Sequence, residues 1–313
     1  IFIGAAMVYF LDKNINSKQE TSQLRIPGYK YTNPLLACDS DVSSGQLSKT
    51  KETLETEIDN SIKSHNLIES SIYIRNLENF DTAIINPELR FSPASLQKIP
   101  LMIAAIKFVE KKPEVQSQQY KFDLTDTSNF LQEIPPGDTL IWGQSYNIST
   151  IIEKLIKYSD NNSSLILKQI IPEQDLYRTY QILFPFYPQD KISDSVELSV
   201  EDAAFPYRVL YNSTYLSRQN SELALQLMTN IDYKQGMVAG LPSDVPVAHK
   251  FGLLTDFDIK TQQVERQLHE CGIVYFPSSP HLVCIMTKSN APLEHVEKYI
   301  QKITSLIYSN LAS

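Results

Sequence analysis

The spacing of apolar residues predicts well-defined helices and strands in the first half of the chain. Leucine and isoleucine at four-residue spacing predict a helix over 48–65. The stretches 68–77 and 82–85 predict two strands joined by a polar turn. Residues 95–111 predict a long helix, and because its positions are apolar nearly all round, we expect it to be buried. Pro100 lies inside this helix and predicts a bend in its second turn.

The second half of the chain combines short helical patterns with a second set of strands. Up to about Met228 the helical patterns are short and interrupted by prolines. Residues 245–254, 271–276 and 282–287 then predict strands, and residues 293–311 predict a final amphipathic helix. Strands at both ends and helices between them do not follow an alternating βαβ order. The pattern predicts an α+β fold, with one antiparallel sheet built from both ends of the chain around a helical insertion.

The N-terminal part differs in composition from the rest. Residues 1–11 are almost entirely apolar, and as a helix they would extend about 17 Å against roughly 30 Å of bilayer hydrocarbon. We interpret them as a truncated signal or membrane-anchor segment; the alternative is a short buried helix or strand. Residues 12–46 are mostly polar and lack a sustained period, which predicts a linker. The folded domain is then 47–313. We expect it to be extracytoplasmic, at the periplasm or cell surface, with membrane contact only through the N-terminal segment.

Composition excludes several other classes of protein. Hydrophobic residues make up 42% of the 313 residues and charged residues 20%, as in an ordinary globular protein. A net charge of -8 argues against a nucleic-acid partner. Separately, we expect the protein to be a monomer. The five histidines are scattered, so no metal or organic cofactor is expected. Cys271 and Cys284 flank a predicted hairpin and could pair across it, but we favour two buried thiols on core strands.

Three short strings carry the candidate chemistry, and the first is Ser95-Leu96-Gln97-Lys98. On a helix, Lys98 lies one turn after Ser95 on the same face, where an amine can take the proton of a serine nucleophile. Burial in this apolar helix would favour the neutral amine that such a base requires. The alternative is a lysine that extends to the surface. The string at 48–51 has the same form but lies on a polar face, so the motif alone is weak.

The other two strings are equally ordinary when each is taken alone. Ser159-Asp160-Asn161 lies between two predicted helices, where such residues also occur simply as turns and N-caps. The third string, 250–252, reads Lys-Phe-Gly and lies on a predicted strand, where a lysine is often a solvated edge residue. A similar string at 234–236 has no strand around it. Order, spacing and local context together make the combination informative.

Together, the three strings resemble those of the class A β-lactamase and penicillin-binding serine hydrolase family, over roughly 47–311. The resemblance implies a five-stranded antiparallel sheet flanked by helices, beside a helical subdomain. It implies that Ser95 is the acylated nucleophile and that Lys98 is its base or proton relay. Ser159 would pass the proton to the leaving nitrogen, and Lys250 would supply positive charge to the site and the substrate carboxylate.

The resemblance also implies a set of substrate-binding residues. Asn161 would hold the amide side chain of the substrate. The backbone N–H groups of Ser95 and of Leu253, which follows Gly252, would form the oxyanion hole. Phe251 departs from the family, which usually has Thr or Ser there to bind the substrate carboxylate with its hydroxyl. An aromatic ring cannot do this, and we expect it to line or block that part of the groove.

A second departure concerns deacylation. In class A enzymes a Glu, with an Asn four residues later, activates the deacylating water. Between Asn162 and Asn212 the sequence contains no Asn, so this pair is absent in its usual form. The candidate substitutes, each of which is otherwise a surface charge, are Glu173, Asp175, Asp190, Asp194 and Glu197.

The resemblance implies a serine hydrolase that forms an acyl-enzyme at Ser95 on β-lactam or related amide and peptidoglycan-type substrates. Because the usual Glu and Asn pair is absent, we expect deacylation to be slow or to use another base. One alternative is a D-Ala carboxypeptidase or esterase that uses the same residues. Another is a non-catalytic cell-surface binding protein on the same fold, with Phe251 lining an altered groove. The two enzymatic hypotheses require the side chains at 95 and 250 to lie in one pocket.

Overall fold

A computed structural model gives the structure of the chain for residues 28–34, 45–124, 129, 132–184, 196–258 and 262–312. The expected anchor segment 1–11, most of the expected linker 12–46 and Cys38 lie outside these described residues. Among the helices of the described part, none has both the length and the apolar character needed to cross a bilayer.

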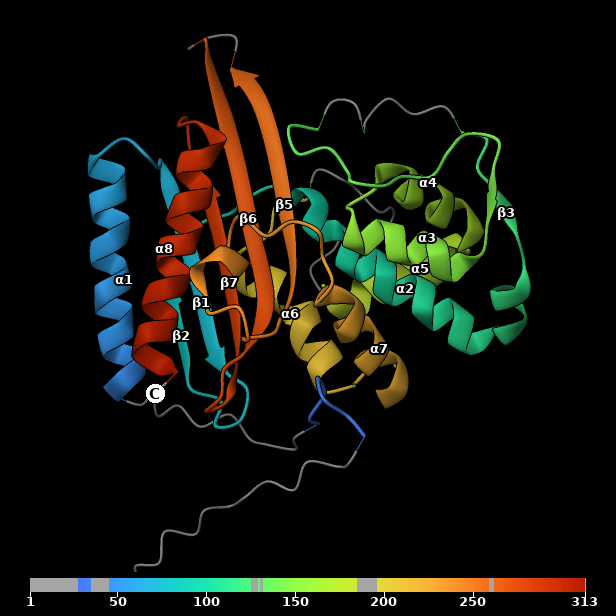
Figure 1. Cartoon of the computed structure of the whole chain (residues 1–313), viewed down its shortest axis with the longest axis horizontal. Helices are drawn as coiled ribbons and strands as arrows, with labels where there is room; N and C mark the ends of the chain where they lie inside the picture. Colours follow the sequence, from blue (N-terminus) through green and yellow to red (C-terminus); the bar gives the residue numbers. More distant parts are fainter. Residues whose placement is uncertain are drawn as a thin grey trace, which may run out of the picture.

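A five-stranded antiparallel sheet forms one side of the molecule (Figure 1). Its strands are β1 (Glu69–Asn76), β2 (Thr82–Ile85), β5 (Val247–Asp258), β6 (Gln263–Tyr275) and β7 (Pro280–Lys288). They are arranged in the order β2-β1-β7-β6-β5, so the early and late parts of the chain share one sheet and β5 is an edge strand. This confirms the predicted α+β fold. The hairpin of β5 and β6 extends beyond the other strands (Figure 1).

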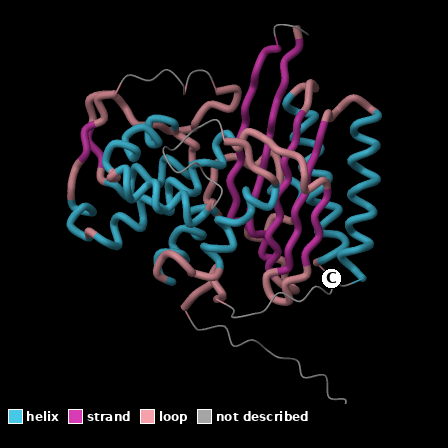
Figure 2. The backbone as a smooth tube through the Cα atoms, turned by 180° about the vertical axis from the view of Figure 1, so that it is seen from behind, coloured by secondary structure: helices cyan, strands magenta, loops and turns pink. Residues whose placement is uncertain are grey.

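Helices cover both faces of the sheet. On the outer face lie α1 (Gly45–Lys63) and α8 (Leu293–Leu311), as the views from both sides show (Figures 1 and 2). Their apolar stripes pack with the sheet in one core, which contains Leu54, Ile72 and Ile303. The other face packs against α6 (Val200–Tyr211) and belongs to a second core that continues into the helical subdomain. The sheet is therefore buried on both sides.

The helical subdomain lies beside the sheet (Figure 1). Its helices are α2 (Lys98–Lys111), α3 (Ile148–Lys157), α4 (Asn161–Ile170), α5 (Glu173–Leu183) and α7 (Arg218–Met228). The smaller elements are the ribbon strands β3 (Tyr120–Lys121) and β4 (Ser145–Tyr146) and the 3₁₀ turns η1 (Ala94–Gln97), η2 (Pro113–Ser117) and η3 (Val238–Gly240). Helix α2 is buried along most of its length, as predicted.

The start of the predicted helix 95–111 differs from expectation. Ser95 lies in the 3₁₀ turn η1, and the α-helix begins only at Lys98. Pro100 is then the third residue of α2. In the first turn an N–H has no intrahelical partner, so a proline there removes no hydrogen bond and the reason for a bend in the second turn disappears.

Cys271 and Cys284 lie opposite each other in the register of β6 and β7 and form a disulfide. The expectation of two separate thiols is therefore wrong. Both residues are fully buried on core strands, so the local sequence does not distinguish them from two separate buried thiols. Only the strand register shows that they are partners.

The short segment 28–34, which we call the docked segment, is fixed to α7. The Glu222 carboxylate accepts the backbone N–H groups of Tyr31 and Thr32 at 2.7 and 2.8 Å and the Thr32 hydroxyl at 2.9 Å. The Tyr31 ring meets the ring of Tyr275 edge to face, with centroids 5.2 Å apart. This segment lies below α7 in Figure 1, far from the tip of the β5–β6 hairpin.

Candidate active site

The three strings meet where the sheet adjoins the helical subdomain. Ser95 is in η1 and Lys98 is the first residue of α2. Ser159 lies in the turn between α3 and α4, and Lys250 lies on β5. The contacts below place these residues around one site, although they come from distant parts of the sequence.

Ser95 lines two cavities that adjoin each other. The larger cavity, of about 360 Å³, is also lined by Lys98 and Asn161. The smaller cavity, of about 150 Å³, is also lined by Phe251 and Glu133. The residues that line both cavities are Ser95, Gln132, Leu253 and Leu254. A bound molecule that spans both cavities would therefore cross the Ser95 hydroxyl.

Lys98 is buried, with only 5% of its surface exposed. Its Nζ donates to the Ser159 carbonyl oxygen at 2.5 Å, to Asn161 Oδ1 at 2.7 Å and to Ser159 Oγ at 3.0 Å. These three acceptors use all three protons of an ammonium group. None of these bonds goes to Ser95 Oγ, so the charged form of Lys98 donates all three protons to the turn that carries Ser159 and to Asn161.

Burial lowers the pKa of Lys98 to about 7, although the Asp160 carboxylate acts in the opposite direction. The neutral amine keeps two N–H donors and gains a lone pair. The carbonyl oxygens of Ser159 and Asn161 can only accept, so they retain the two donors. The lone pair is then directed at a hydroxyl, either that of Ser159 or that of a serine in the cavity. Lys98 can therefore act as a base near neutral pH.

Lys250 is completely buried on the other side of the Ser159 hydroxyl. Its Nζ lies 2.9 Å from Ser159 Oγ and 3.0 Å from the Phe251 carbonyl oxygen. Burial, together with the nearby charge of Lys98, lowers the pKa of Lys250 well below its usual value. The Ser159 hydroxyl thus connects two amines, which is an arrangement that can transfer a proton between them.

Asp160 holds this turn in place. Ser159 has a left-handed backbone, with φ 58°, which costs about 1–2 kcal/mol in a residue that is not glycine. Asp160 is fully buried and caps α4 by accepting the backbone N–H of Ser163 at 2.9 Å. Its carboxylate also accepts the Thr139 hydroxyl at 2.5 Å and Asn129 Nδ2 at 2.7 Å. These bonds offset the strain at Ser159 and fix its hydroxyl.

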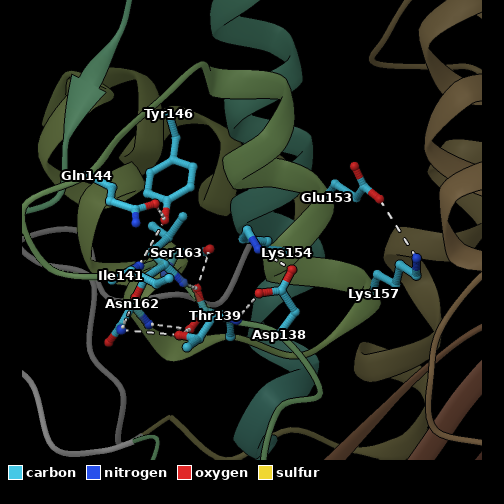
Figure 3. Close-up of polar contacts among 12 residues, drawn as sticks. Asp138, Thr139, Ile141, Gln144, Tyr146, Glu153, Lys154, Lys157, Asn162 and Ser163 are labelled. Atoms are coloured by element: carbon cyan, nitrogen blue, oxygen red, sulfur yellow. Dashed lines mark hydrogen bonds and ion pairs between the residues drawn. The ribbon is translucent and has the colours of Figure 1, made fainter.

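The loop that crosses α3 and α4 is fastened by further polar contacts (Figure 3). Asn162 Nδ2 donates to Thr139 Oγ1 at 3.2 Å and to the Leu140 carbonyl oxygen at 3.0 Å. Asp138 forms an ion pair with Lys154 of α3. The same loop therefore supports the turn at Ser159 from outside the cavities.

Gly252 brings β5 close to the backbone of η1. A Cβ at this position would lie 2.6 Å from the Pro93 carbonyl oxygen and 3.1 Å from the backbone nitrogen of Ser95. The next residue, Leu253, lines both cavities. Ala94 has φ 47°, which turns the chain sharply just before Ser95. Gly252 therefore lets β5 come close to the backbone at Ser95, directly before Leu253.

Phe251 forms part of the wall of the smaller cavity and does not fill it. Its ring is 5% exposed and packs on Tyr233, with centroids 4.3 Å apart. The Nζ of Lys250 lies 4.1 Å from the centroid of the same ring. The ring therefore covers Lys250, where the resemblance would place a hydroxyl.

The comparison of sequences shows the family. The model of the Beta-lactamase enzyme family matches residues 53–311, which is most of the chain. The protein belongs to the β-lactamase enzyme family. A search of curated proteins finds no match.

Solved structures share the fold of this β-lactamase-family protein. TLA-1 extended-spectrum β-lactamase aligns with a TM-score of 0.70 at 16% identity, over 84% of this chain and 99% of that one. PBP-A aligns with a TM-score of 0.66 at 16% identity, over 90% and 98% of the two chains. A β-lactamase from Chitinophaga pinensis aligns with a TM-score of 0.68 at 18% identity, over 83% of this chain and 98% of that one.

The family's deacylating carboxylate has no counterpart among the described residues that line the larger cavity. Asp175 forms an ion pair with Lys111 away from this cavity, and neither Glu173 nor Glu197 lines it. Asp190 and Asp194 lie outside the described residues. In the described part of this β-lactamase-family protein, no cluster of three or more His, Cys, Asp or Glu side chains has a metal-binding arrangement.

Sequence reasoning did not predict three residues that shape the site. Asp160 lies in the second string, where the sequence indicates an N-cap only as the alternative to a functional motif. Glu133 follows a stretch with no periodicity, and nothing in its neighbours marks it. Tyr180 lines the larger cavity, and its hydroxyl lies 3.4 Å from the Gln97 carbonyl oxygen. The N-cap preference of Asp was the one usable signal.

Proposed function

We propose that this protein is an extracytoplasmic serine hydrolase that forms an acyl-enzyme at Ser95 with β-lactams or related amide and peptidoglycan-type substrates. Membership of the β-lactamase enzyme family supports the reaction class. One of the neighbouring structures is an acyl-enzyme complex of a PBP-A variant with penicillin G, which shows that this fold accommodates such a complex.

The proposed acylation uses the groups around Ser95 in sequence. Ser95 Oγ attacks the carbonyl carbon while its proton goes to the neutral Lys98 amine. The Oγ–C bond forms, the C–N bond breaks, and Ser159 passes the proton to the leaving nitrogen. The N–H groups of Ser95 and Leu253 stabilise the negative charge on the carbonyl oxygen. Water then cleaves the Oγ–C bond, which releases the acid and returns a proton to Ser95.

One observation carries the proposal: the Ser159 hydroxyl lies 3.0 Å from Lys98 Nζ and 2.9 Å from Lys250 Nζ. A lysine that reaches the surface, or one on a solvated strand edge, would not be buried against the same hydroxyl. Burying two amines together is costly, and such unfavourable arrangements are typical of functional sites. A proton relay next to a nucleophile is one function that fits them.

We propose that deacylation is slow. Among the described residues the larger cavity contains no carboxylate that could activate water. The acyl-enzyme would then persist, and the protein would behave more as a penicillin-binding protein than as an efficient β-lactamase.

Labelling with a fluorescent penicillin tests the proposal. The intact protein should become labelled, and Ser95→Ala should abolish the labelling. Ser48→Ala is the matched control, because Ser48 begins the second string of the same form and is exposed on α1. Labelling that survives Ser95→Ala would refute the assignment of the nucleophile. A chase with unlabelled penicillin measures deacylation, and rapid loss of label would refute the slow step.

Two other functions each have an observation in their favour. The apolar ring of Phe251 favours an esterase on the same site, and ester hydrolysis without cephalosporin hydrolysis would select it. Release of D-Ala from a stem peptide would instead select a carboxypeptidase that uses the same residues. The bonding of Lys98 to Ser159 and Asn161, with none to Ser95, favours a non-catalytic binding protein. Absence of covalent labelling by every acyl donor, with reversible binding retained, would select that function.

A further inference from the structure

The smaller cavity differs in charge from the larger one. Among the described residues that line it, Glu133 is the one charged side chain, and Phe251, Ile134 and Leu253 supply apolar surface. The larger cavity instead has Lys98 in its wall and Lys168 at its edge. A group that enters the smaller cavity therefore meets an apolar wall and one carboxylate.

Two cations, Lys250 and Arg266, contact residues that line the smaller cavity but are bound to other groups. The Phe251 ring lies over Lys250, whose Nζ is bonded to Ser159 and to the Phe251 carbonyl oxygen. Arg266 binds Glu133 through Nε at 3.0 Å and Nη2 at 2.9 Å and donates from Nη1 to the Ala291 carbonyl oxygen at 3.1 Å. These contacts neutralise the guanidinium and direct it away from the cavity.

Glu133 is itself held at the wall of the cavity. Its Oε2 accepts the Thr255 hydroxyl at 2.7 Å, in addition to the bonds from Arg266. Desolvation acts to raise the pKa of Glu133, but the hydrogen bonds from Arg266 and Thr255 outweigh it and lower the pKa overall. The carboxylate is therefore ionised at neutral pH. Because Glu133 lines the cavity and Arg266 does not, the pair presents its negative end to the cavity and would repel an anion there.

The two cavities receive different parts of a substrate. Under the acyl transfer proposed above, Asn161 holds the acyl side chain in the larger cavity. The leaving group then extends past Ser95 into the smaller cavity, beside Phe251.

We infer that the smaller cavity selects acyl donors whose leaving group is uncharged or cationic, and that Phe251 and Glu133 reject a leaving group that carries a carboxylate. This inference rests on the proposed acyl transfer at Ser95. The preferred substrates are then neutral or cationic esters and amides. Penicillins and peptides that end in a free carboxylate would still acylate Ser95, but more slowly than these preferred donors.

A matched pair of esters tests the inference. Both carry the phenylacetylglycyl acyl group; one has phenol as its leaving group and the other has 3-hydroxybenzoate. In each case Ser95 Oγ bonds to the acyl carbon, the ester C–O bond breaks, and the proton of Ser95 reaches the departing phenol oxygen. The rate at which Ser95 gains the acyl mass is followed by mass spectrometry of the intact protein.

We expect the phenyl ester to acylate Ser95 about tenfold faster or more, which corresponds to repulsion of roughly 1.4 kcal/mol between close charges. In Glu133→Gln and Phe251→Thr the ratio should fall toward one. A third ester, with 3-(aminomethyl)phenol as leaving group, should react at least as fast as the phenyl ester.

The outcomes separate this inference from the proposed function. If the carboxylated ester reacts as fast as the phenyl ester in the natural protein, the inference is wrong and the acyl transfer stands. If none of the three esters acylates Ser95, the proposed function fails and the inference fails with it. The ester comparison in the natural protein decides the matter even if a variant does not fold.

Discussion

His269 Nε2 lies 2.9 Å from the carbonyl oxygen of Ser92, three residues before Ser95. The other ring nitrogen, Nδ1, accepts the backbone N–H of Thr287 at 3.2 Å. Because Nδ1 is an acceptor, Nε2 carries the proton and donates to Ser92. This ring links two strands of the sheet to the turn that carries the proposed nucleophile.

The link predicts different effects for two amide replacements. His269→Gln can place a donor near the position of Nε2, whereas His269→Asn places its polar group near Nδ1. We expect His269→Asn to slow acylation of Ser95 more than His269→Gln does, and both to lower the free energy of unfolding by about 1–3 kcal/mol. Urea unfolding and labelling kinetics measure the two effects. Equal labelling rates in the two variants would show that the Ser92 contact does not position Ser95.

The same histidine predicts a pH-dependent stability. Burial lowers the pKa of His269 from 6.5 to about 4. Between these values the unfolded chain binds more protons than the folded one, so the stability falls as the pH is lowered from 6.5 to 4. Measured by urea unfolding across this range, the loss should be smaller in His269→Gln. An identical pH dependence in both proteins would contradict the prediction.

Acylation should depend on pH through Lys98. Its pKa of about 7 means that the neutral amine, which acts as the base, becomes the main form above this pH. The rate of labelling should therefore fall as the pH is lowered through about 7. Labelling of exposed side chains by a reactive dye, measured in parallel, should not show the same fall. Above pH 7 Lys98→Met should label at least about 100-fold more slowly than the natural protein, because the base is missing, and the difference should narrow at lower pH. A flat profile from pH 6 to 8 in the natural protein would exclude Lys98 as the base.

Asp160 should contribute strongly to stability. In Asp160→Asn, one carboxylate oxygen becomes an NH₂ group that faces donors such as the Thr139 hydroxyl or the Ser163 N–H. We expect the free energy of unfolding to fall by roughly 3 kcal/mol, since buried donors lose a charged acceptor. Asp138→Asn is the matched control: its ion pair with Lys154 has a half-exposed carboxylate and is worth about 0–1 kcal/mol. Similar losses in both variants would count against the role of Asp160.

Gly252→Ala should disturb the site without removing a functional group. The new methyl group would lie 2.6 Å from the Pro93 carbonyl oxygen, so β5 and η1 have to move apart. We expect labelling of Ser95 to slow by about tenfold or more, and stability to fall by about 1–3 kcal/mol. Gly45→Ala serves as the control because nothing lies within 4 Å of its Cβ position. Unchanged labelling in Gly252→Ala would refute the assignment of the oxyanion hole.

Periodicity predicted most of the fold because burial in the sheet and helices repeats with the element's own period. It missed the outer half of the β5–β6 hairpin, which was predicted to end at 254 and to resume at 271. The strands in fact continue to Asp258 and from Gln263. Side chains such as Phe257, 54% exposed, carry no burial signal there, and backbone hydrogen bonds between the strands hold the hairpin.

The site was predictable only where function places residues at fixed spacing. Ser95 and Lys98 are neighbours on one turn, so sequence alone relates them. The pairing of Glu133 with Arg266 joins a loop to a strand 133 residues away, and no local pattern predicts such a contact. The same is true of the Cys271–Cys284 bond, which depends on strand register.

The docked segment fixes the point at which the preceding chain joins the domain. Glu222 and Tyr275 hold residues 31 and 32 in place against the domain. The β5–β6 hairpin lies at the opposite end of the domain from this segment, so it would be the part farthest from any attachment made through residues 28–34 (Figure 1). The seven residues of the docked segment would thus decide which end of the molecule faces its surroundings.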